Sequence, residues 1–191
     1  KKISKRIKGE FFTEKIFVDQ AHDYISKHFG EDWKEKYVVW DCCCGTNNLT
    51  KDYNFSNLYL STLEQEDIDN INVEATVFQY DFLNDNYDKL PESLKDHIES
   101  GKDIIFFINP PYFKANPMKG IDGTDVCTTD IGEEMRLKKF GMSSSQLSTQ
   151  FLYRILKLGM RGAPSKEARC YYEQGIQIAY ELLRLQELRL K

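Results

Sequence analysis

The sequence has no hydrophobic run near the roughly 18 residues that a membrane span requires, and no apolar segment follows its basic start, "KKISKRIKG". We therefore expect a soluble, intracellular protein without a secretory signal. An excess of positive charge is also missing, since the formal net charge is -4. This balance argues against a chain that binds nucleic acid over its whole surface, but not against a catalytic core whose DNA-binding region lies elsewhere.

Disulfide and dinucleotide patterns are missing too. The chain has 5 cysteines, an odd number, and Cys42, Cys43 and Cys44 are adjacent, which suits neither a disulfide framework nor a zinc knuckle. We expect reduced thiols. A G-x-G-x-x-G fingerprint would indicate a nicotinamide cofactor, but only Gly45 is present in "DCCCGTNN".

Periodicity and turn signals in the 191 residues predict one α/β domain with a mainly parallel sheet flanked by helices. Residues 13–29 predict a helix with Thr13 as N-cap and Gly30 as the stop. Its apolar face is expected to hold Phe17, Ala21, Tyr24, Ile25 and Phe29. The expected strands lie at 37–40, 58–62, 76–80 and 104–108, and the last is expected to be buried on both faces. Further helices are expected at 90–100 and from 147 onward, the second with caps at 143–145. We also expect a mobile loop at 114–145 and a helical tail at 165–191.

A polar residue follows each predicted strand. These residues are Asp41, Glu64, Asp81 and Asn109. Parallel sheets bind ligands beyond the carboxyl ends of their strands, so all four are expected on one rim. Taken singly, each has an ordinary alternative, such as a simple β-to-α turn around Gly45 or a solvated acid in "EQED".

The stretch "DIIFFINPPYF" carries the most specific signal. Asn109 offers an amide acceptor, and the carbonyls of Pro110 and Pro111 are held by rings that fix φ, so they can form a clamp for an exocyclic NH2 group. Tyr112 adds an aromatic face for a planar base. The alternative is a strand that ends in a proline-rich turn.

The order of "GEFFTEK", "DCCCGTNNLT", "LEQED", "YDFL" and "NPPY" over residues 9–112, followed by the helix "QLSTQFLYRIL", resembles a known family. It is similar to the amino-methyltransferases that use S-adenosylmethionine, and most closely to the adenine-N6 DNA methyltransferases with the gamma order of motifs. The resemblance implies a Rossmann-like methyltransferase fold.

The resemblance also implies roles at matching positions. Phe12 and Thr13 would contact the cofactor, with Thr13 near its methionine carboxylate. Asp41 and Gly45 would support the methionine part. Glu64 would accept the ribose hydroxyls.

At the remaining positions, Asp81 and Phe82 would hold the adenine ring of the cofactor, and Asn109, Pro110 and Tyr112 would hold the target base. No metal is needed for this chemistry. Asn47 stands where the family has Gly, and Glu14 where it has Pro. Asn tolerates a positive φ.

The partner expected from the resemblance is DNA with a flipped-out target adenine, in a restriction-modification system of a bacterial or phage-encoded cytoplasmic enzyme. Three alternatives remain open: methylation of a protein glutamine, methylation of an RNA adenine, and a non-catalytic subunit with the same fold.

The domain organisation looks incomplete beside that family. We expect a partial catalytic domain at 1–160 and a helical tail at 161–191, without a target-recognition domain. The sheet lacks strands on its C-terminal side, so we expect a fragment or a chain with lost segments.

Overall fold

A computed structural model of the chain describes residues 13–111 and 128–162. They fall into two compact units, one that ends at Asn109 and one that begins at Pro110. The division lies inside the predicted catalytic domain of residues 1–160. The predicted tail at 165–191 lies outside the described residues.

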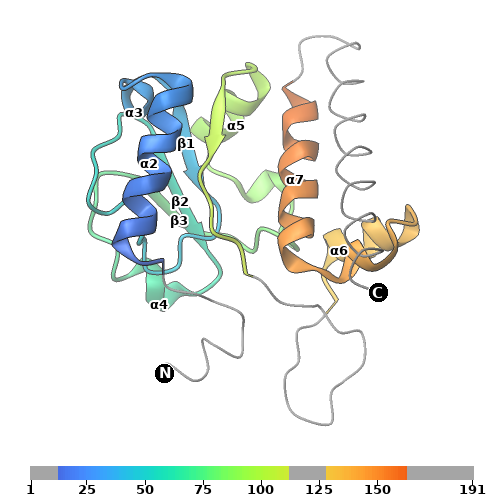
Figure 1. The fold of residues 1–191 in the computed structure, drawn as a ribbon. Coiled ribbons are helices and arrows are strands. Elements are labelled where there is room, and N and C mark those ends of the chain that lie inside the picture. Colours follow the sequence, from blue (N-terminus) through green and yellow to red (C-terminus); the bar gives the residue numbers. More distant parts are fainter. Residues whose placement is uncertain (1–12, 112–127, 163–191) are drawn as a thin grey trace. The chain divides into compact units, whose positions relative to one another are not determined.

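The first unit is built on a parallel sheet with the strand order β3-β2-β1-β4 (Figure 1). Every neighbouring pair of strands runs parallel, with Val39 opposite Leu58 and Ile105. The mainly parallel α/β fold predicted from the sequence is therefore confirmed for this unit. The strands are β1 (Val38–Asp41), β2 (Leu58–Thr62), β3 (Thr76–Gln79) and β4 (Ile104–Phe106).

Alternate residues of β1 serve two different cores, because successive side chains of a strand point to opposite faces. Val39 belongs to a cluster with Val18, Trp33 and Leu60. Trp40, on the other face, donates from Nε1 to Ser61 Oγ over 3.1 Å. Burial on both faces explains why the central strands β1 and β2 each begin with three consecutive apolar or aromatic residues.

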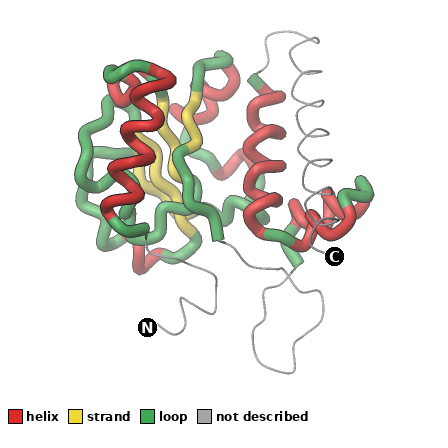
Figure 2. Tube along the Cα trace, in the orientation of Figure 1, coloured by secondary structure: helices red, strands yellow, loops and turns green. Residues whose placement is uncertain are grey.

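Helices cover both faces of this sheet (Figure 2). The helix α2 and the short α3 bring Val18 and Trp33 to the first core. The helix α5 buries Leu94 and Ile98, and its Ser93 accepts a hydrogen bond from Tyr59. The elements are α2 (Lys15–Phe29), α3 (Trp33–Lys36), α4 (Gln65–Ile68), the 3-10 turn η1 (Tyr87–Lys89) and α5 (Glu92–Glu99).

Two details of the first unit differ from the prediction. The helix α2 has Glu14 rather than Thr13 at its N-cap, and it buries Val18 and His22 while Phe17 and Tyr24 are 60% and 64% exposed. Ala21 and Ile25 of the predicted apolar face do pack against the core, on either side of the buried His22. The strand β4 is half-buried, not buried on both faces, since β1 is its only neighbour among the described strands.

The second unit holds α6 (Asp130–Leu137), η2 (Gly141–Ser145) and α7 (Leu147–Arg161). The predicted loop at 114–145 is therefore wrong over its described part, because polar bonds rather than apolar spacing order it. Thr129 Oγ1 caps α6 by accepting from Gly132 N, and it donates to the buried Gln150.

The predicted helix after 147 is confirmed, with Leu147, Phe151 and Leu158 buried. Its predicted serine caps are wrong, since Gln146 is the N-cap and Ser143–Ser145 belong to η2. No helix in residues 13–111 and 128–162 is long and apolar enough to cross a membrane.

Candidate active site at the rim of the sheet

The topology places four predicted site residues at one edge of the sheet. Asp41 ends β1, and the chain reaches Glu64, Asp81 and Asn109 just after β2, β3 and β4. All four strands run parallel, so these positions share the carboxyl edge. The strand β1 lies between β2 and β4, which makes its end the switch point where parallel sheets bind ligands.

The most direct contact at this rim joins Asn109 to Thr13. Asn109 Nδ2 donates to Thr13 Oγ1 over 2.9 Å, across 96 positions of sequence. The bond identifies the donor edge of the amide, so Oδ1 is the edge that can accept from another molecule. Sequence reasoning assigned both residues to the site but did not foresee their contact.

Asp41 is a buried acid at the end of β1, only 1% exposed. Its Oδ1 accepts from Cys43 N over 3.1 Å. Burial raises the pKa of Asp41 to about 7, against the lowering effect of the bonds from Cys43. None of the salt bridges among the described residues involves Asp41. A buried carboxyl without a cationic partner is what a positively charged ligand would stabilise.

The loop after β1 has an open backbone position and a buried, unpaired amide. Gly45 has φ of 49°, and an added Cβ would meet no atom of residues 13–111 and 128–162 within 4 Å. Asn47 adopts φ of 58°, a conformation that asparagine tolerates. Asn47 Oδ1 accepts from Thr50 Oγ1, whereas its buried Nδ2 has no hydrogen-bond partner among the described residues. No pattern in the sequence indicates this donor without an acceptor.

The three thiols that follow Asp41 in the sequence are largely shielded from solvent. Cys42 and Cys44 are buried and Cys43 is half-buried, and all are free thiols. A hydrogen bond with Cys42 and then burial raise the pKa of Cys43, while burial and the charge of Asp41 raise that of Cys44. Within residues 13–111 and 128–162, no group of three or more acidic, His or Cys side chains could hold a metal ion.

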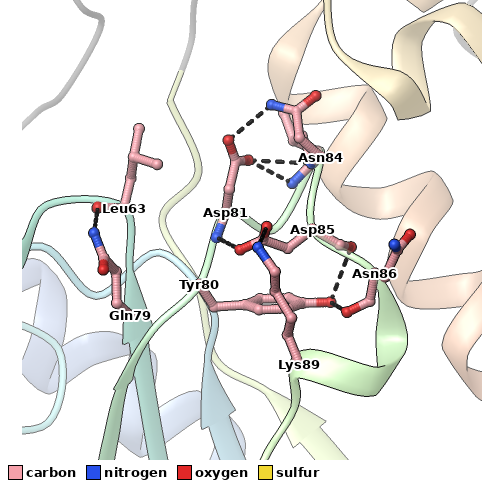
Figure 3. Close-up of polar contacts among 9 residues, drawn as sticks. Leu63, Gln79, Tyr80, Asp81, Asn84, Asp85, Asn86 and Lys89 are labelled. Carbon is pink, nitrogen blue, oxygen red and sulfur yellow. Dashed lines mark hydrogen bonds and ion pairs between the residues drawn. The ribbon is translucent and has the colours of Figure 1, made fainter.

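Asp81 closes the turn that follows β3 (Figure 3). Its Oδ1 accepts from Leu83 N and Asn84 N over 3.0 and 3.2 Å, and its Oδ2 accepts from Asn84 Nδ2 over 2.7 Å. Asp85 Oδ2 in turn accepts from Asp81 N over 2.9 Å. The carboxylate is thus fixed in place by its own turn, and Oδ2 keeps acceptor capacity beyond this one bond.

Phe82 and Glu64 have contrasting environments. The Phe82 ring is 3% exposed and meets Trp40 edge-on, with 5.4 Å between ring centroids. It therefore stabilises the aromatic core beneath the rim. Glu64 is exposed at the N-cap position of α4, and its side chain makes no capping bond there.

The remaining predicted residues are not part of this geometry. Phe12 and Tyr112 lie outside the described residues, and Pro110 belongs to the second unit. No family model, curated protein or solved structure matches the chain. What the rim can do therefore follows from its own residues.

Proposed function

We propose that the protein is an S-adenosylmethionine-dependent methyltransferase that acts on the exocyclic N6 amine of adenine in DNA. One observation carries the proposal: Asn109, oriented by Thr13, stands at the same carboxyl edge as Asp41, Glu64 and Asp81. This edge combines an amide acceptor for an amine with acidic acceptors for a nucleoside.

The residues present fit such a cofactor. Gly45 leaves open space at the end of β1, and the buried Nδ2 of Asn47 is a donor without a partner in the described part of the chain. Asp41 and Gly45 would support the methionine part, which carries positive charge. Glu64 would accept from the ribose hydroxyls, and Asp81 from the adenine amino group. When bound, the cofactor supplies an electrophilic methyl group.

The protein's contribution to the reaction is positioning and electrostatics. Asn109 Oδ1 would accept one hydrogen of the target amine and the Pro110 carbonyl the other, which localises the nitrogen lone pair. Thr13 holds the Asn109 amide so that Oδ1 faces outward from their bond. Tyr112 would supply the stacking face for the base.

The experiment compares Asn109→Ala with the wild-type chain. Transfer of a labelled methyl group to DNA with adenine in many sequence contexts should fall at least about a hundredfold, because the acceptor that aligns the amine is gone. The matched control is Asn57→Ala, since Asn57 precedes β2 at the opposite edge of the sheet. Retained transfer in Asn109→Ala would refute the clamp.

The same labelled assay separates the alternatives. Label on RNA adenine or on a protein glutamine, with none on DNA, would replace DNA as the substrate. Binding of S-adenosylmethionine is measured first by calorimetry. A folded sample that binds none would favour a non-catalytic subunit and end the proposal.

A further inference from the structure

His22 is a polar residue in the middle of the buried face of α2, between Val18 and Ile25. It is 3% exposed, and its Nε2 lies 2.9 Å from the Leu49 carbonyl oxygen. A carbonyl can only accept, so Nε2 carries the proton and Nδ1 carries a lone pair. The buried Nδ1 has no hydrogen-bond partner within residues 13–111 and 128–162.

Aromatic rings surround this imidazole. Tyr53 stacks on it, with centroids 3.6 Å apart and planes inclined by 15°. Phe107 meets it edge-on at 5.0 Å, and Trp33 lies at 5.4 Å. These rings provide no strong acceptor for a hydrogen on Nδ1. The environment therefore favours the uncharged imidazole.

Through these contacts, the helix α2 holds one segment of the chain in place. That segment, residues 45–53, is called the glycine loop below, and it begins at Gly45. Besides the bond to Leu49, Tyr53 Oη donates to Asp19. Inside the loop, Thr50 Oγ1 donates to Asn47 Oδ1. A displacement of Leu49 would therefore also displace Asn47 and the backbone at Gly45.

The charges that face His22 come from three elements. Lys15 and Asp19 lie on α2 itself, Lys34 lies on α3, and Tyr53 is the titratable residue of the loop that stacks on the imidazole, while Phe107 after β4 is uncharged. Burial lowers the pKa of His22, the bond to Leu49 opposes this, and Lys34 lowers it further. Protonation would place an unpaired N–H among the rings.

We propose that His22 is a positioning residue for the glycine loop: its Nε2–H holds the Leu49 carbonyl while the ring stays buried, and protonation adds an Nδ1–H that has no acceptor among the described residues, which favours a displaced ring and a looser loop. Its effect on cofactor affinity rests on the proposed function. Its effect on the loop does not.

The test measures amide hydrogen exchange in peptides that cover residues 42–53 of the full chain. His22→Phe keeps an aromatic ring but removes the donor, and His22→Gln keeps an Nε2–H donor but cannot titrate. Exchange near neutral pH should become about tenfold faster in His22→Phe, because a buried carbonyl loses its partner, and change little in His22→Gln. The control is His28→Phe, on an exposed residue of the same helix.

The pH dependence is measured on the wild-type chain, which removes any concern that His22→Phe fails to fold. Nitrogen NMR of the imidazole should show the Nε2–H tautomer and a titration midpoint below the ordinary histidine value. Loop exchange, corrected for its intrinsic pH dependence, should accelerate with the same midpoint and stay flat in His22→Gln. Loop exchange that does not change as His22 titrates, or an Nδ1–H tautomer, would overturn the inference.

Calorimetry with S-adenosylmethionine separates this inference from the proposed function. If both hold, His22→Phe binds about tenfold more weakly, in step with its loop exchange. A loop that loosens in a wild-type chain that binds no cofactor would sink the proposed function alone. Unchanged exchange in folded His22→Phe, with cofactor bound normally, would sink the inference alone.

Discussion

Asn109 and Thr13 share a hydrogen bond of 2.9 Å from the amide Nδ2 to the hydroxyl Oγ1. One residue follows the edge strand β4 and the other precedes α2. Their contact joins the two ends of the first unit at the rim. It also decides which face of the amide can meet a substrate, so the hydroxyl of Thr13 is expected to matter for transfer rather than for folding.

Thr13→Val should reduce methyl transfer about tenfold to a hundredfold while the chain stays folded. Valine keeps the shape but cannot accept from Nδ2, so the Asn109 amide loses the bond that orients it, and small misplacements are costly in catalysis. The measurement is the initial rate with labelled cofactor. Thr13→Ser is the matched control and should retain most of the rate.

A double-mutant cycle isolates the pair. If Thr13 acts through Asn109, adding Thr13→Val to Asn109→Ala should lower the rate no further. Additive losses would mean that Thr13 has a separate role, such as the direct cofactor contact that the family resemblance implies.

Asp41 should make the first unit less stable as the pH rises. Its folded pKa is about 7, above the ordinary value of 3.8, so the folded chain keeps a proton that the unfolded chain has lost. The free energy of unfolding therefore falls between about pH 4 and pH 7 and then levels off. Each pH unit between the two pKa values corresponds to about 1.4 kcal/mol.

Asp41→Asn removes this titration and keeps an oxygen that can accept from Cys43 N. In urea unfolding, the variant should match the wild type near pH 4 and exceed it by up to roughly 4 kcal/mol near pH 8. If the difference in the free energy of unfolding between the two proteins did not vary with pH, the pKa of Asp41 would not be raised in the folded chain.

The sheet could be predicted because its signals are local. Short strand signals such as Leu58–Thr62 match the observed strand β2, and strands that alternate with helices imply a parallel order. The parallel order in turn places Asp41 and Asn109 at one edge before any coordinate is known. That much of the candidate site follows from patterns in the chain.

The contacts that refine the site could not be predicted, because they join distant positions. Nothing near Thr13 in the sequence indicates Asn109, and nothing in the glycine loop indicates that His22 binds Leu49. Periodicity also does not indicate that His22 is buried in α2, since it counts apolar residues only. In residues 128–145, Thr129 and Gln150 order a polar stretch that composition describes as loop.

Gly132→Ala should destabilise the second unit by about 1–3 kcal/mol. An added Cβ would lie 2.7 Å from Gln150 Nε2 and 3.1 Å from the Ser144 carbonyl oxygen. These two atoms already share a hydrogen bond of 2.7 Å, so the methyl group would disrupt it. Thermal unfolding measures the loss. Leu152→Ala, at a 49% exposed position of α7, is the control and should change stability little.

Gly45→Ala distinguishes space kept for a ligand from simple backbone strain. An alanine at φ of 49° costs about 1–2 kcal/mol of stability, but its Cβ meets no atom within 4 Å among the residues that the structure describes. Gly101→Ala imposes similar strain at φ of 69°, ahead of β4 at the opposite edge of the sheet. Both variants should lose similar stability, whereas only Gly45→Ala should weaken S-adenosylmethionine binding, by about tenfold or more, because its methyl group occupies the open space that the proposal assigns to the cofactor. Equal affinities in the two variants would mean that the space at Gly45 serves no such ligand.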